Sequence, residues 1–193
     1  PDNITVASGV DALNHSLESI MSLKFDACNL DLCNLGIESI WSSLPKVIDN
    51  NKNIEERTNM LLGSGIAGKA IHFTGCGICH CIAHTLGSMT NVPHGIAIAY
   101  GLFHTIEPTL KYNQDLHLRF KGVFENLTSD SLTQKIQNWI HNLKIDFSLI
   151  EKKIDFDEFI KIYYLENNKC MRDNTYYQPA ESDLKMLLQT LWN

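Results

Sequence analysis

Two pairs of candidate metal ligands occur at helical spacing in this chain. Asp11 and His15 stand four residues apart, and His80 and His84 repeat that spacing further along. Side chains four residues apart project from the same face of a helix, about one turn apart, so each pair could grip an ion from two sides. His94 follows in a Pro-His-Gly turn, where a helix is expected to begin. These five donors could therefore converge on one metal ion.

The segment GCGICHCIAHTLGSMTNVPHG, residues 75–95, is compatible with other chemistry as well. Cys76, Cys79 and His80 match the C-x-x-C-H pattern by which c-type haem is attached. Together with Cys81, the same residues could instead hold zinc through thiolates. The pattern by itself supports both sites, and the two conflict.

Purely structural roles compete with a metal site. Asp11 could cap its helix from the first turn, and His80 or His84 could be a hydrogen-bonded core histidine. Met89 is of a type that more often fills a core than binds a metal. Spacing alone does not choose among the five donors.

The composition limits the compartment and the kinds of partner. With 193 residues, 44% of them hydrophobic, the chain is long enough for one domain with a sizeable core. A net charge of −6 offers no basic surface for nucleic acid or for an anionic membrane. Neither a long apolar run nor a secretion signal is visible, and six cysteines are too few for a disulfide scaffold. We expect a cytoplasmic protein with reduced thiols.

Because the chain starts with Pro rather than Met, we also expect it to belong to a longer product.

Apolar positions recur at helical spacing along nearly the whole chain, and no stretch alternates convincingly with a period of two. Ser8 is a candidate N-cap for the first helix, and Asp155 is one for a later helix. The pattern predicts an all-α, multi-helix domain of eight or nine helices. Their expected spans are 9–23, 26–44, 54–72, 77–87, 94–106, 115–126, 130–143, 155–167 and 180–192, with a solvated loop at 167–178.

Two segments resemble the signatures of the iron-containing alcohol dehydrogenases, a family within the dehydroquinate synthase-like superfamily. They are ASGVDALNHSLE at 7–18 and GICHCIAHTLGSMTNVPHGIA at 77–97, in the family's order and separation. The resemblance runs through about 10–113 and fades afterwards. It implies that residues 1–193 form the family's C-terminal helical, metal-binding catalytic domain.

The resemblance also implies roles for individual residues. Asp11, His15, His80 and His94 would bind one divalent metal, Fe²⁺ or in its place Zn²⁺. His84 would lie nearby as a proton-relay or cofactor-proximal histidine. The metal would polarise the oxygen of a small alcohol or aldehyde for hydride exchange with NAD(P)H. Since the family needs no flanking thiols, the C-x-x-C-H match is then a coincidence.

Departures from the family qualify these expectations. The family's N-terminal nucleotide-binding α/β domain, with its glycine-rich phosphate loop, has no counterpart in this chain. NAD(P)H would therefore bind through a domain that is not present here, and this chain alone should not oxidise alcohols. Asn174-Thr175-Tyr176 stands where Asn-Pro-Arg is usual. We expect a homodimer, and the rival hypotheses are a non-catalytic helical interaction module and a c-type electron-transfer protein.

Overall fold

The computed structural model describes residues 2–125, 127–150 and 154–191, and within them it is built from helices without any strand. The all-α prediction is therefore confirmed. The α-helices are α1 (Asp2–Met21), α2 (Leu30–Asp49), α3 (Ile54–Thr74), α4 (Ile78–Met89), α5 (His94–Tyr112), α6 (Leu116–Arg119), α7 (Ser129–Asn142), α8 (Phe156–Tyr163), α9 (Glu166–Arg172) and α10 (Glu181–Gln189). Short 3₁₀ turns at Ala27–Asn29 and Phe147–Leu149 complete the described part.

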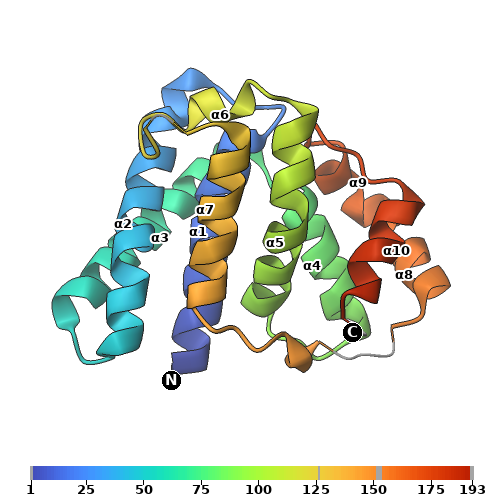
Figure 1. The fold of residues 1–193 in the computed structure, drawn as a ribbon, viewed down its shortest axis with the longest axis horizontal. Helices are drawn as coiled ribbons and strands as arrows, with labels where there is room; N and C mark the ends of the chain where they lie inside the picture. The colour runs from blue at the N-terminus through green and yellow to red at the C-terminus, as the bar shows by residue number, and fades with distance from the viewer. Residues whose placement is uncertain (1, 126, 151–153, 192–193) are drawn as a thin grey trace.

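Helix α1 lies at the centre of the molecule and packs against α2, α3 and α5 (Figure 1). Helices α4 and α5 pack against each other, and α4 also contacts α8 and α9. Helices α2 and α3 stand at one end in Figure 1, and α8, α9 and α10 gather at the other. The two segments that carry the candidate ligands are thereby brought together in the middle of the fold.

The core follows from the apolar spacing of α1. Val10, Leu13, Leu17 and Ile20 recur every three or four residues, and all four are fully buried. Helices α2, α3 and α5 cover these apolar residues and hold α1 in place. The direction in which the polar residues of α1 point is fixed as a result. In the part of the chain that the structure describes, no helix combines the length and the apolarity needed to cross a membrane.

Several expected helix boundaries are wrong. Helix α1 begins at Asp2, so Ser8 is not its N-cap; instead the Ser8 hydroxyl donates a hydrogen bond to the Ile4 carbonyl oxygen, 2.8 Å away, within the helix. Helix α2 continues through Pro45 and ends at Asp49. Leu44 before the proline and Val47 after it are both buried, so both sides of Pro45 remain packed against the core. Of the span expected at 115–126, whose last residue lies outside the described part of the chain, only the four residues of α6 are α-helical.

The largest correction concerns the C-terminal third. The expected helix 155–167 breaks after Tyr163, and α9 occupies part of the expected loop 167–178, which raises the number of α-helices from the predicted eight or nine to ten in the described chain. The buried Arg172 accounts for the break, because its guanidinium donates hydrogen bonds to the carbonyl oxygens of Tyr163, the last residue of α8, and of Leu165, the N-cap of α9. Asp155 does cap α8, accepting a hydrogen bond from the Glu158 backbone N–H.

Helices α1 and α5 cross at very short range where Gly95 meets Ala7. A Cβ atom placed on Gly95 would lie 1.9 Å from the Ala7 carbonyl oxygen, which is backbone and cannot rotate away. Gly95 directly follows His94, so this crossing also sets the distance between His94 and the ligands on α1. Only glycine is compatible with such an approach.

We predict that Gly95→Ala destabilises the protein by about 1–3 kcal/mol or more, because the added methyl group must push α5 away from α1. Gly65→Ala is the matched control: Gly65 lies inside α3 with nothing within 4 Å of the added atom. It should stabilise by up to about 1 kcal/mol through helix propensity. Thermal and urea unfolding of both variants measures the difference. Equal stability of the two variants would contradict the close crossing.

Candidate metal centre

The predicted ligands come from three helices. Asp11 and His15 project from one face of α1, one turn apart, and His80 lies near the start of α4. His94 is the first residue of α5, after the N-cap Pro93. Asp11 is therefore far inside α1 rather than in its first turn, so the alternative that it caps the helix is wrong.

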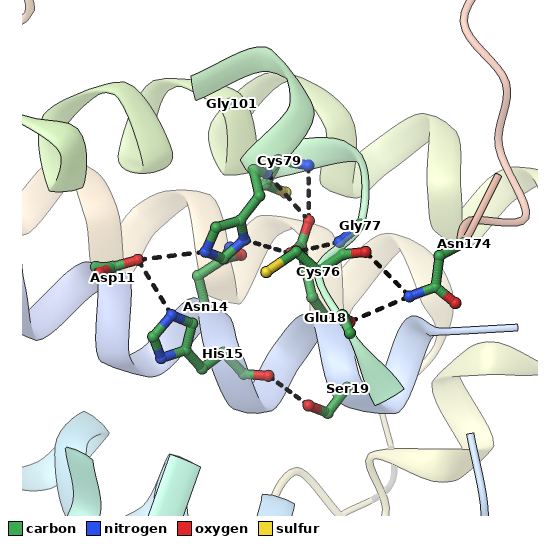
Figure 2. A network of polar contacts seen from close by, with 12 residues as sticks. Asp11, Asn14, His15, Glu18, Ser19, Cys76, Gly77, Cys79, Gly101 and Asn174 are labelled. Atoms are coloured by element: carbon green, nitrogen blue, oxygen red, sulfur yellow. Dashed lines mark hydrogen bonds and ion pairs between the residues drawn. The ribbon is translucent and has the colours of Figure 1, made fainter. Parts of the chain in front are cut away.

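The side chains of these four residues meet around one atom, the Oδ1 oxygen of Asp11. The Nε2 atoms of His15 and His80 each lie 3.5 Å from it, and the Nε2 atom of His94 lies 3.7 Å from it. The His15 and His80 rings are stacked, with centroids 5.2 Å apart. In Figure 2 the labelled side chains of Asp11 and His15 point toward one another, and a dashed line joins them.

The Asp11 oxygen fits a metal ligand. Oδ1 is buried and accepts no hydrogen bond from any residue that the structure describes, a costly state for a carboxylate oxygen unless a cation compensates it. Two ligand atoms that are each about 2.1 Å from a tetrahedral ion lie about 3.4 Å apart. The three distances from Asp11 to the imidazole nitrogens match that spacing. One donor atom from each of Asp11, His15 and His80 forms a cluster within 4.8 Å.

His84 lies beside the cluster rather than in it. Its ring centroid is 5.5 Å from that of His94 and 6.2 Å from that of His80, and its side chain is exposed. A cavity of about 270 Å³ opens next to the cluster, with Asp11, His94, Ala7 and Ile96 in its wall. His84 is therefore an exposed side chain at the edge of the donor cluster.

Electrostatics separate His80 from the other imidazoles. Burial lowers the pKa of His15 and of His94 below the ordinary value, so both are neutral at pH 7. Burial also acts to lower the pKa of His80, but the Glu18 charge and the hydrogen bonds around the ring outweigh it and raise the pKa to about 12. Burial acts to raise the pKa of Asp11, yet its attraction to the three imidazoles holds the pKa below the ordinary value. Asp11 is therefore an anion that faces two neutral imidazoles, His15 and His94, and a protonated His80 ring, which must release the proton on Nε2 before it can bind a metal.

The thiols of the C-x-x-C-H pattern do not line this centre together. Cys79 is fully buried, and its sulfur lies 3.2 Å from the Thr105 hydroxyl in the core. Burial raises the pKa of the Cys79 thiol well above its ordinary value, which keeps it protonated and unreactive. All six cysteines are free. A thiol enclosed in this way reaches neither a haem vinyl group nor a zinc ion.

Glu18 is the last residue of the first motif, and the sequence alone indicated no role for it. Glu18 is buried on α1 and contacts His80 through a hydrogen bond of 2.5 Å between Oε2 and Nδ1. The signal was present in the spacing: Asp11, His15 and Glu18 follow one another at intervals of four and three, which places them on one helix face. The sequence could not show that the Glu18 carboxylate is covered by α4.

Comparisons with known proteins identify relatives of the whole chain. The Fe-containing alcohol dehydrogenase family, C-terminal, matches residues 5–192. The resemblance therefore does not fade after residue 113, as the motifs had suggested. A probable alcohol dehydrogenase of Salmonella typhimurium is 38% identical over 99 residues, which are 51% of this chain and 25% of that protein. Alcohol dehydrogenase 4 of Schizosaccharomyces pombe is 28% identical over 98% of this chain and 46% of its own length.

A solved structure shares the fold over the full length. The sulfoacetaldehyde reductase of Bifidobacterium kashiwanohense, in complex with NAD⁺, superimposes with a TM-score of 0.84 at 18% identity, covering 100% of this chain and 51% of that one. The chain thus spans about half the length of the proteins that it matches from end to end. With its helical fold and a family match from residue 5 to residue 192, the chain belongs to the Fe-containing alcohol dehydrogenase family, as its C-terminal helical part.

Proposed function

We propose that this chain is the metal-binding catalytic domain of an iron-type, NAD(P)-dependent alcohol dehydrogenase or aldehyde reductase. The observation that carries the proposal is the buried Asp11 Oδ1 atom, which lacks a hydrogen-bond donor among the described residues and has three imidazole nitrogens 3.5–3.7 Å away. Family membership supports it independently, because the relatives are alcohol dehydrogenases.

The proposed ligands are Asp11, His15, His80 and His94. One carboxylate and three neutral imidazoles on a divalent ion leave a net charge of +1, and this mixture of hard and borderline donors suits Fe²⁺ or Zn²⁺. The family's name favours iron. A bound ion of this kind supplies Lewis-acid chemistry, polarising the oxygen of an alcohol or a carbonyl group.

The protein's own groups would then position and protonate the substrate. The proposed ligands on α1, α4 and α5 would hold the ion, and the cavity that Asp11 and His94 line would admit a small alcohol or aldehyde. His84, whose pKa is lowered mainly by burial, is neutral near pH 7 and could accept a hydroxyl proton and pass it to solvent. We therefore propose His84 as the proton carrier and as the residue closest to the cofactor.

The remaining functional elements are proposed to lie outside this chain. Hydride exchange requires a nicotinamide cofactor. A nucleotide-binding domain outside residues 1–193 would hold it; this proposal is supported by the sulfoacetaldehyde reductase, whose chain is about twice as long and whose structure contains NAD⁺. A homodimer and a cytoplasmic location remain expectations from the family resemblance and the composition. The alternative function, a helical interaction module without catalysis, predicts that the donor cluster binds no metal.

We predict that the purified protein binds about one Fe²⁺ or Zn²⁺ per chain and that Asp11→Asn weakens this affinity by more than 100-fold. Loss of an outer-shell partner already costs about 10–100-fold, and Asp11 would be a direct ligand. Asp31→Asn, an exposed aspartate on α2, is the control and should bind as wild type does. Anaerobic metal titration followed by elemental analysis measures both. Wild-type protein without bound metal would favour the interaction module.

Metal binding should release about one proton per ion at pH 7.5. His80 is protonated on both nitrogens before binding, because its pKa is raised to about 12, whereas His15 and His94 are already neutral. Affinity should therefore rise about tenfold per pH unit around neutrality and more steeply below the lowered pKa values of the other two imidazoles. Calorimetry in buffers with different ionisation enthalpies counts the protons. Zero release would show that His80 is neutral in the metal-free protein.

In the holoenzyme that contains this chain, His84→Gln should lower kcat for aldehyde reduction by about 10²–10³, the usual range for loss of a proton-transfer group. Metal affinity should change by less than threefold, because His84 lies outside the ligand cluster. His72→Gln, an exposed histidine on α3, is the matched control. Steady-state kinetics across pH tests the role, which an unchanged kcat would contradict.

A further inference from the structure

We propose that Glu18 is a positioning residue that holds the His80 ring so that its Nε2 atom faces the metal. This inference rests on the proposed function, since it assigns a task within the same centre. Glu18 itself is not a ligand, because its carboxylate lies on the Nδ1 side of His80, while Nε2 faces Asp11.

The Glu18 carboxylate is surrounded by hydrogen-bond donors. Oε2 lies 2.5 Å from His80 Nδ1 and accepts from the Gly77 backbone N–H at 2.9 Å. Oε1 accepts from the backbone N–H of Cys79 at 2.7 Å and, more weakly, from that of His80 at 3.4 Å. Only a group that accepts and never donates can satisfy all four contacts, and an ionised carboxylate is such a group.

These contacts place Glu18 at the N-terminus of α4. Gly77 is the N-cap of α4 and provides no side-chain cap, so the Glu18 carboxylate, reaching across from α1, satisfies the free backbone N–H groups instead (Figure 2). A Cβ atom on Gly77 would lie 3.2 Å from Glu18 Oε1, which leaves little room for any larger residue there. One side chain therefore caps the helix and contacts the ring that the helix carries.

The contact with Nδ1 determines which nitrogen can bind a metal. A neutral imidazole carries one proton, and a carboxylate at Nδ1 keeps the proton there, so the lone pair of Nε2 is free. Nε2 is the atom 3.5 Å from the Asp11 oxygen. The Asn14 amide is also near Nδ1, at 3.4 Å, a longer and weaker contact than that of Glu18. Glu18 thus fixes both the tautomer and the orientation of His80.

The same turn is held from its other side by Asn174. Its amide group donates to the carbonyl oxygens of Thr74, Gly75 and Cys76 at 2.9–3.1 Å, and its Oδ1 atom accepts from the Ser22 hydroxyl at 2.7 Å. Asn174 stabilises the start of α4 without contacting His80. Asn174→Ala therefore separates the effect of a loosened turn from the effect of a misplaced ring.

The test compares Glu18→Gln with Asn174→Ala. An amide has an N–H group that must face one of the four donors, so Glu18→Gln should weaken Zn²⁺ affinity by about 10–100-fold. In ¹⁵N NMR spectra of the Zn²⁺-loaded protein, the slowly exchanging His80 Nδ1–H signal should be lost. Asn174→Ala should lower the melting temperature yet keep that signal and bind Zn²⁺ within threefold of wild type. If Glu18→Gln does not fold, Glu18→Asp, which keeps the acceptor-only group on a shorter arm, should keep the Nδ1–H signal and bind with intermediate affinity.

Two results would overturn the inference. One is a Glu18 variant with unchanged Zn²⁺ affinity and an unchanged His80 Nδ1–H signal. The other is an equal loss of affinity in Asn174→Ala at an equal drop in melting temperature, which would reduce Glu18 to a helix cap. If wild-type protein binds no Zn²⁺, the proposed function fails. The role of Glu18 is then decided by whether Glu18→Gln loses the His80 Nδ1–H signal that wild type shows in the metal-free state.

Discussion

The structure depends on how two carboxylates on one helix face are neutralised. Burying a carboxylate is unfavourable by several kcal/mol unless donors or cations meet it. Glu18 is met by three backbone N–H groups and the His80 ring, whereas the buried Asp11 oxygen has no donor among the described residues. Both residues project from α1 toward His80. Because the Asp11 oxygen lacks a hydrogen-bond donor, a cation would be stabilised on the Nε2 side of the His80 ring.

Close packing of helices makes this arrangement achievable. The start of α5 reaches α1 where Gly95 touches Ala7, and α5 approaches α4 where a Cβ atom on Gly101 would lie 3.1 Å from the Cys79 carbonyl oxygen. Small residues at these crossings bring three backbones close enough for short side chains to share an ion. The rigidity of the apolar core then holds the ligands in place before any metal binds, which lowers the cost of ordering them.

The cysteines show how a local pattern can mislead. Cys76, Cys79 and His80 satisfy the spacing for haem attachment, but α4 turns the Cys79 sulfur into the core toward Thr105 while His80 faces α1. On a helix, residues next to each other in sequence point in different directions. The same geometry that places His80 in the centre therefore removes Cys79 from it.

The sequence by itself determined the helical class, most helix positions, the five candidate donors and the resemblance to a family, because these follow from short-range spacing and local motifs. It could not determine that α1 extends back to Asp2, or that α8 ends at Tyr163, where Arg172 at the far end of α9 donates to the Tyr163 carbonyl oxygen, since those outcomes depend on packing and on distant carbonyl groups. Only the tertiary structure showed that His15, His80 and His94 approach one oxygen of Asp11, that His84 stays at the edge, and that Glu18 lies behind His80. The physical reason is that periodicity fixes which face of a helix a residue occupies, whereas the neighbour of that face is chosen by how the helices pack.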